Sequence, residues 1–263
     1  MSNDFDRPEA YVDFETGEVI RYPKPEWLVE SNQSDLAIND LRLLDALIAH
    51  SWNQAPLVEM GHVFEEDYRA IHISLFGEKK RDRRTIKTAL ENLKKWKIKL
   101  AFNDDVSGER LFSHAEIDNA IVKWVFDPRI HELISETHKY GNFDLKKAAK
   151  LTSKYAYILN GYAAIYINRR RNFLTLSVDE WRKIFGAHET LSDWSNFLNR
   201  CLRPAINQIN ELDESSFSIR VKEIPYKYKK NSTQNISFTF EKKDKVSEEP
   251  DDKTSDESKA KVM

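Results

Sequence analysis

The stretch "SDWSNFLNRCLRPAINQINEL", Ser192 to Leu212, predicts one amphipathic helix, and the interpretation of the whole chain starts from it. Its apolar residues recur at steps of three and four, which is the spacing of one face of an α-helix. Ser192 is the expected N-cap. The residues of this apolar stripe are Trp194, Phe197, Leu198, Cys201, Leu202, Ala205, Ile206, Ile209 and Leu212.

The opposite face of this helix carries Asn and Arg where a solvated helix usually carries Glu and Lys. Asparagine is a poor helix former, so local stability does not account for it there. Arginine can bond both acceptors of a guanine, and asparagine can bond adenine through one donor and one acceptor. We therefore expect this face to read bases in a DNA major groove, although a solvated face or a protein contact is the alternative. The candidate DNA-binding residues are Ser195, Asn196, Asn199, Arg200, Arg203 and Asn207.

Two basic segments add candidate phosphate contacts. After the helix, residues 216–242 predict a hairpin whose turn is rich in lysine, the pattern of a wing that contacts the DNA backbone; the candidates are Lys222, Lys227, Lys229 and Lys230. Earlier in the chain, "KKRDRR" opens another predicted helix and suits phosphate contact more than base reading. An ordinary solvated helix start is the alternative for this second set, which comprises Lys79, Lys80, Arg81, Arg83, Arg84 and Lys87.

Charge is distributed unevenly along the 263 residues, although the net charge is only −2. Residues 1–75 carry 5 basic and 15 acidic side chains, whereas residues 142–240 carry 16 basic and 9 acidic ones. A basic block inside a near-neutral chain points to a polyanionic partner, although uneven solvation charge would look the same. The acidic N-terminus predicts no signal peptide, and no apolar run is long enough for a membrane span. With a single cysteine, Cys201, the sequence predicts a cytoplasmic protein without disulfides or membrane association.

The same order of elements occurs twice, which predicts two tandem winged helices. Helical periodicity over 36–52, 63–77 and 83–97 is followed by a predicted hairpin, and a long helix at 145–167 opens a second series that ends in the hairpin at 216–242. The predicted fold class is α+β, mainly helical with small antiparallel sheets. The predicted domains are an irregular N-terminal arm (1–33), a first winged helix (34–138), a second winged helix (139–243) and a disordered acidic tail (244–263).

Several enzyme classes are disfavoured by missing motifs. A rolling-circle initiator, an enzyme that cuts DNA, needs two histidines that flank one hydrophobic residue and bind a metal. The run His72-Ile73-Ser74 does not fit, because a serine stands in place of the second histidine. The sequence contains no Gly-x-x-x-x-Gly-Lys-Ser/Thr phosphate loop, and its one cysteine cannot form a zinc cluster. We therefore expect no catalytic site, no metal and no cofactor.

The motifs of the second half resemble the plasmid replication initiators of the two-winged-helix Rep type. The resemblance rests on "LRLLDALIA", on "SKYAYILNGYAAIY" followed by "LTLSVDEWRKIFG", and above all on "FLNRCLRPAINQINELDESSFSIRV". It covers roughly residues 34–243, and it accounts for Pro204 inside a helix as a feature of the family.

The resemblance implies an iteron-binding initiator of plasmid replication. The second winged helix would read direct repeats at the origin, and the first would contact adjacent backbone and form a dimer interface near Ile98–Phe102 and Ile121–Phe126. Monomers would start replication, and dimers would repress the promoter of the initiator's own gene and so contribute to copy control. Host replication proteins are possible partners. A winged-helix transcription regulator without an origin role is the alternative, because its DNA chemistry would be the same; a protein–protein module is a further rival.

Overall fold

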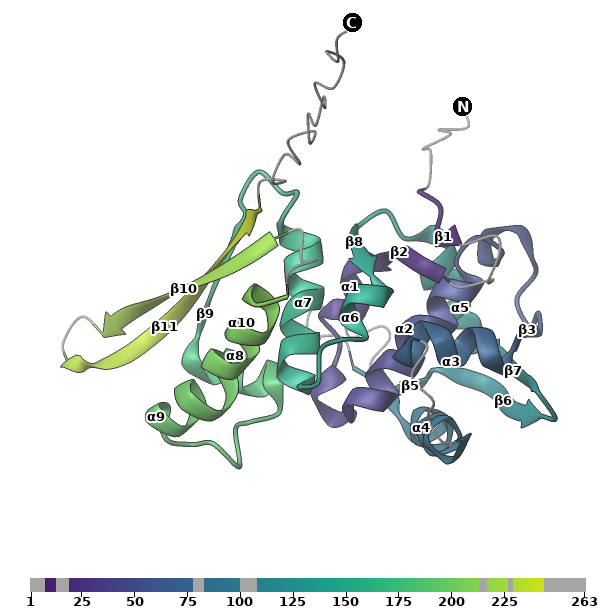
Figure 1. The fold of residues 1–263 in the computed structure, drawn as a ribbon, viewed down its shortest axis with the longest axis horizontal. Coiled ribbons are helices and arrows are strands. Elements are labelled where there is room, and N and C mark those ends of the chain that lie inside the picture. Colours follow the sequence, from purple (N-terminus) through teal and green to yellow (C-terminus); the bar gives the residue numbers. More distant parts are fainter. Residues whose placement is uncertain are drawn as a thin grey trace, which may run out of the picture.

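A computed structural model describes residues 8–12, 19–77, 83–99, 108–212, 217–226 and 229–243, with Tyr226 and residues 229–234 described by their backbone. Two halves of similar element order lie side by side (Figure 1). Among the described helices, none is both long and apolar enough to cross a membrane. The predicted acidic tail, 244–263, lies outside the described residues.

The first half combines helices with a small antiparallel sheet of strand order β3-β7-β6. Its main helices are α2 (Ile38–Ser51), α3 (Tyr68–Phe76), α4 (Arg83–Lys95) and α5 (Pro128–Glu136). Its strands are β3 (Phe64–Asp67), β6 (Phe112–Asp118), β7 (Ile121–Phe126) and the short pair β4 (Lys97–Ile98) and β5 (Glu109–Arg110), and a short turn of 3-10 helix, η2, spans Ala55–Leu57. The predicted helix over 63–77 begins only at Tyr68, because the four residues before it pair with β7 as a strand.

The second half repeats this plan with a longer hairpin. Its sheet has the order β10-β11-β9, and all neighbouring strands are antiparallel. Its elements are α7 (Lys154–Tyr166), β9 (Phe173–Ser177), α8 (Val178–Phe185), α9 (Trp194–Phe197), η4 (Leu198–Leu202), α10 (Arg203–Asn210), β10 (Phe217–Tyr226) and β11 (Lys229–Lys242). The predicted fold class, α+β with two winged helices and small antiparallel sheets, is confirmed.

Helix α8 shows how local sequence sets the limits of an element. Ser177 Oγ accepts the backbone N–H of Glu180 at 3.2 Å, and the Glu180 carboxylate accepts the backbone N–H of Ser177 at 2.8 Å. This reciprocal capping satisfies two donors that the first turn leaves open. At the other end, Gly186 adopts a left-handed conformation with φ of 62°, which closes the helix.

The prediction of an irregular arm over residues 1–33 is wrong for much of this segment, which forms strands and short helices. A third sheet, of order β1-β2-β8, is built from β1 (Tyr11–Val12), β2 (Val19–Pro25) and β8 (Tyr140–Asp144), and α1 (Glu26–Val29) and η1 (Gln33–Asp35) follow it. The sequence of β2 lacks the alternation of apolar and polar residues that indicates a strand, because it contains two prolines and has a lysine, Lys24, at a buried position. Residues at the start of the predicted second domain therefore pair with the N-terminal strand.

The buried residues of both halves form one continuous cluster. Helix α7 lies between the halves, because its Tyr157 bonds Asp45 of α2 and its other side packs on α10. In the second half, Trp181 packs edge-on against Phe238 with ring centroids 4.6 Å apart. The two winged helices therefore share α7 as a common packing surface.

Replacing Gly141 with alanine should destabilise the protein strongly. An added Cβ would lie 2.3 Å from the carbonyl carbon and oxygen of Ala164, so β8 and α7 would have to separate. Overpacking of this kind typically costs about 1–3 kcal/mol, and here the obstacle is backbone rather than a flexible side chain. Urea unfolding should show a lower midpoint for Gly141→Ala; the control Gly61→Ala, with nothing within 4 Å of its Cβ, adds only local strain from its φ of 92°. Equal midpoints for the two variants would contradict this packing.

Candidate nucleic-acid interface

The predicted helix Ser192–Leu212 is continuous but changes its winding in the middle. Its N-cap is Asp193 and not the predicted Ser192: the Asp193 carboxylate accepts the backbone N–H of Asn196 at 3.0 Å. A carboxylate at this position also interacts favourably with the positive end of the helix dipole. The Ser192 carbonyl instead accepts a hydrogen bond from Arg182.

Pro204 accounts for the change in winding. Proline has no backbone N–H, and its ring clashes with the carbonyl four residues earlier, here that of Arg200. The segment η4 is a π-helical turn, in which the Arg203 N–H bonds the Leu198 carbonyl five residues back. The wider turn admits the proline inside the helix without ending it.

All six predicted residues of this helix lie on its exposed face. The structure leaves Ser195, Asn196, Asn199, Arg200, Arg203 and Asn207 exposed, and it buries Phe197, Leu198, Cys201, Leu202, Ala205, Ile206 and Ile209. We call the six exposed residues the Asn/Arg row.

Three members of the Asn/Arg row are hydrogen-bonded to one another. Asn199 Nδ2 donates to Ser195 Oγ at 3.2 Å, and Arg203 Nη1 donates to Asn199 Oδ1 at 2.8 Å. Arg200 has no hydrogen-bond or ion-pair partner among the described residues. Arg203 is thus held in one orientation along the helix, while the donors of Arg200 are open to a ligand.

The buried side of the helix is fixed to the rest of the second half. Phe197 packs on Phe185, and the guanidinium of Arg182 lies over the Phe197 ring at 5.6 Å. Asn210 exchanges two hydrogen bonds with the backbone of Ile219 on β10, at 2.7 and 2.9 Å. Asn210 therefore anchors the helix to the hairpin. Cys201 is buried, and burial raises the pKa of its thiol, which agrees with a core role.

The β10–β11 hairpin extends away from the body on the side opposite the first half (Figure 1). Lys222 is exposed on β10. Lys227 lies outside the described residues, and Lys229 and Lys230 are described only as backbone of β11. Sequence reasoning missed Arg220, whose exposed side chain bonds Glu241 across the hairpin. Successive side chains of a strand point to opposite faces, so this alternation along β10 would have placed Arg220 on the same face as Lys222.

The basic segment of the first half is only partly described. Lys79, Lys80 and Arg81 lie outside the described residues, whereas Arg83, Arg84 and Lys87 are exposed on α4. The Arg83 guanidinium lies over the Tyr68 ring at 5.8 Å and donates to the Asn119 carbonyl, so the protein itself holds this side chain. All three residues line a groove of about 510 Å³ between α4 and β6.

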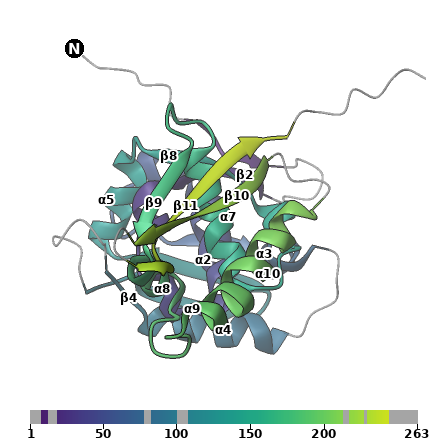
Figure 2. The same cartoon turned by 90° about the vertical axis from the view of Figure 1, so that its left-hand side faces the viewer.

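Helices α4 and α9 lie at the same edge of the molecule in both views (Figures 1 and 2). One linear ligand along that edge could therefore meet both helices. No group of three or more His, Cys, Asp or Glu side chains in the described part of the chain could hold a metal ion.

Comparison with known proteins agrees with this architecture. The family described as "Initiator Replication protein, WH1" matches residues 23–160, and the one described as "Initiator Rep protein, WH2" matches residues 177–240. A solved structure of Pi initiator protein in complex with iteron DNA superposes with a TM-score of 0.67 at 17% identity, covering 84% of this chain and 96% of that one. Domains 2 and 3 of RctB give a weaker likeness, with a TM-score of 0.48 at 12% identity over 78% of this chain and 82% of that one. No curated protein sequence matches the chain.

Proposed function

Because the chain belongs to the family of initiator replication proteins, we propose that it binds double-stranded DNA sequence-specifically at a plasmid origin and starts replication there. The observation that carries the proposal is the Asn/Arg row, six exposed side chains on one face of the last helix of the second winged helix. Side chains of these types match the acceptor and donor patterns of guanine and adenine in the major groove. The likeness to an initiator that was solved with iteron DNA supports the same mode of binding.

The two halves take different parts in this proposal. The second winged helix, residues 139–243, reads bases through the Asn/Arg row and contacts phosphate through the lysines of the hairpin. The first winged helix, residues 34–138, contacts adjacent backbone through Arg83, Arg84 and Lys87 of α4. Net charge favours this division, because residues 142–240 carry 16 basic and only 9 acidic side chains.

The finer parts of the proposal are binding to direct repeats and repression of the initiator's own gene by a dimer. The first half carries the dimer interface in this scheme. Within the sheet, β7 (Ile121–Phe126) lies between β3 and β6, so both of its edges are already paired. A strand of a second copy could therefore pair only with β3 or β6. Of the other expected dimer segment, Ile98 is buried, and residues 100–102 lie outside the described residues.

A footprint of the purified protein on the DNA flanking its own gene, with random duplex as competitor, tests the proposal. Protection of several direct repeats, each about two helical turns long, would support the initiator. Protection of an inverted repeat at the promoter alone would support a transcription regulator instead. Absence of protection at low salt would mean that the Asn/Arg row meets a protein and not DNA.

Neutralising the wing lysines should weaken binding to every DNA sequence. In Lys227→Gln/Lys229→Gln/Lys230→Gln, each lost phosphate contact lowers the number of released counterions by about one, so the slope of log K against log salt should flatten by about one unit per contact. Titrations of specific and random duplexes at several salt concentrations measure both slopes. The control is Arg170→Gln/Arg171→Gln, which removes two exposed cations from the turn between α7 and β9. A slope that stays unchanged in the triple variant would remove the wing from the interface.

A further inference from the structure

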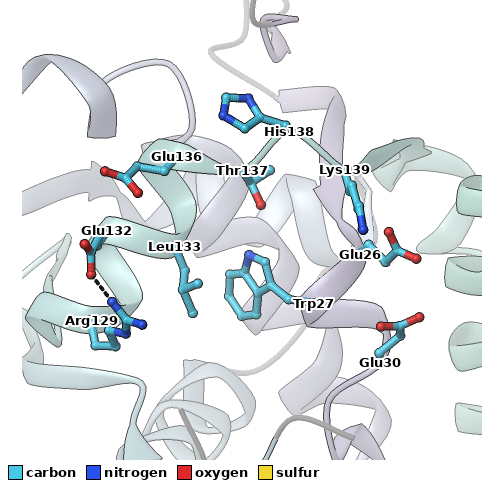
Figure 3. Close-up of a pocket in the computed structure, with 10 residues that line it drawn as sticks. All are labelled: Glu26, Trp27, Glu30, Arg129, Glu132, Leu133, Glu136, Thr137, His138 and Lys139. Atoms are coloured by element: carbon cyan, nitrogen blue, oxygen red, sulfur yellow. Dashed lines mark hydrogen bonds and ion pairs between the residues drawn. The ribbon is translucent and has the colours of Figure 1, made fainter. Parts of the chain in front are cut away.

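A hollow of about 640 Å³ lies between α1, one face of α5 and residues 137–139, which lead into β8 (Figure 3). Its lining includes Glu26, Trp27, Glu30, Leu133 and Glu136, and we call it the α1–α5 groove. Helices α5 and α10 lie on opposite sides of the molecule in Figure 2. The groove is therefore remote from the Asn/Arg row, and the proposed DNA contacts leave it open.

The charges of the α1–α5 groove are not balanced internally. Four carboxylates line it, of Glu26, Glu30, Glu132 and Glu136, against the cations of Arg129 and Lys139. Arg129 pairs with Glu132, as Figure 3 shows, and Arg169 approaches one carboxylate oxygen of Glu26 at 2.6 Å. Within the described residues, Glu30 and Glu136 form no ion pair. The groove thus offers two carboxylates to a cationic ligand.

One polar atom that lines the groove lacks a partner. Trp27 Nε1 is buried and has no hydrogen-bond partner among the described residues. A buried donor without a partner is rare in native proteins, because it loses its bonds to water. A backbone carbonyl oxygen of a bound peptide would accept this hydrogen bond.

The environment of Glu30 also favours a cation. Burial and the neighbouring Glu26 carboxylate raise the pKa of Glu30 to about 7. A cation placed beside these carboxylates would lower that pKa and stabilise the charged form. Trp27 and Leu133 give the groove an apolar surface next to this acidic one, and both pack against the core.

We propose that the α1–α5 groove binds a segment of a partner protein in which a lysine or arginine stands next to an apolar residue. The cation meets Glu30 and Glu136, the apolar side chain covers Trp27 and Leu133, and a backbone carbonyl accepts from Trp27 Nε1. The acidic lining repels nucleic acid and acidic segments. Since the site lies away from the Asn/Arg row, this partner and DNA can be bound together.

Selection from a library of random nonapeptides displayed on phage, with the full chain immobilised, tests this proposal. Recovered peptides are synthesised, and their Kd is measured by fluorescence anisotropy. We expect them to carry a Lys or Arg beside an apolar residue. Glu30→Gln/Glu136→Gln should weaken their binding about tenfold, the effect of losing a charge-assisted hydrogen bond, and Trp27→Phe should weaken it severalfold while keeping the apolar ring.

Glu59→Gln is the control, because Glu59 is an exposed glutamate in the turn between η2 and β3, outside the groove; it should leave peptide binding unchanged. Thermal unfolding and affinity for random duplex show whether the variants remain folded, and neither should decrease. The proposal is overturned by recovery of peptides without basic residues, by equal affinity for wild type and the double variant, or by a selection that recovers no binder. None of these outcomes would contradict the proposed binding to the origin, because the footprint tests that proposal separately.

Discussion

Arg200→Ala and Arg203→Ala should each weaken specific DNA binding far more than nonspecific binding. Both side chains are exposed on the Asn/Arg row, and Arg203 is oriented by Asn199 at 2.8 Å. A bidentate contact between arginine and guanine is worth about 1–3 kcal/mol of discrimination, so each variant should lose roughly tenfold to a hundredfold on the cognate site. On random duplex each should lose only the contribution of one charge. Competition titrations on both DNAs, at one fixed salt concentration, measure the two losses.

Arg171→Ala is the control for this experiment. Arg171 is an exposed arginine of the turn between α7 and β9. That turn lies at the end of the second half opposite α9 (Figure 1). Removal of Arg171 takes away the same charge but should leave the ratio of specific to nonspecific affinity unchanged. Equal losses on cognate and random duplex for Arg200→Ala and Arg203→Ala would rule out base reading by these residues. Asn199→Ala should resemble a weaker Arg203→Ala, because it removes the group that orients Arg203.

The sequence predicted those parts of the fold in which local pattern and tertiary environment agree. The last helix is an example, since its apolar stripe, its exposed row and the proline inside it are all local features. Its π turn was not predicted, because it arises from a clash between Pro204 and the Arg200 carbonyl that hydrophobic spacing does not record. The N-cap was misplaced by one residue, which is the usual precision of such boundaries.

Strand β2 was missed because its environment comes from distant segments. Its core position 24 is a lysine, and only the position of Asp45 on α2 makes a lysine acceptable there. The α1–α5 groove was missed for the same reason, since its carboxylates come from parts of the chain about 100 residues apart. The Asn/Arg row was predictable because a single helix presents it. The phosphate contacts of α4 and the wing were predicted from charge alone, and they stay predictions.

Lys24→Met should be among the most destabilising single changes in the chain. Lys24 and Asp45 are both 1% exposed, and Lys24 Nζ lies 2.7 Å from Asp45 Oδ2. Tyr157 of α7 donates to the same oxygen at 2.8 Å, and Tyr22 of β2 donates to the other oxygen. Burial and the Asp45 carboxylate raise the pKa of both tyrosines well above the usual range, which keeps their hydroxyls protonated as donors. The network joins the N-terminal strand, the central helix of the first half and the long helix of the second.

Without Lys24, the Asp45 carboxylate stays buried with two neutral donors and no counter-charge. Breaking a buried pair in this way typically costs about 3–5 kcal/mol, which in a chain of this size lowers Tm by roughly 10 °C. Scanning calorimetry measures the shift. Arg21→Met is the control on the same strand, because its ion pair with Asp144 is half exposed at Arg21 and should contribute about 1 kcal/mol or less.

The double variant Lys24→Met/Asp45→Leu separates the cost of an unpaired charge from the loss of packing. Since apolar replacement of both partners of a buried pair is often nearly neutral, it should recover much of the stability that Lys24→Met loses. The recovery should be incomplete, because the hydroxyls of Tyr22 and Tyr157 would then lack their acceptor. If the double variant were as unstable as the sum of its two single changes, the ion pair of Lys24 and Asp45 would contribute nothing that depends on pairing.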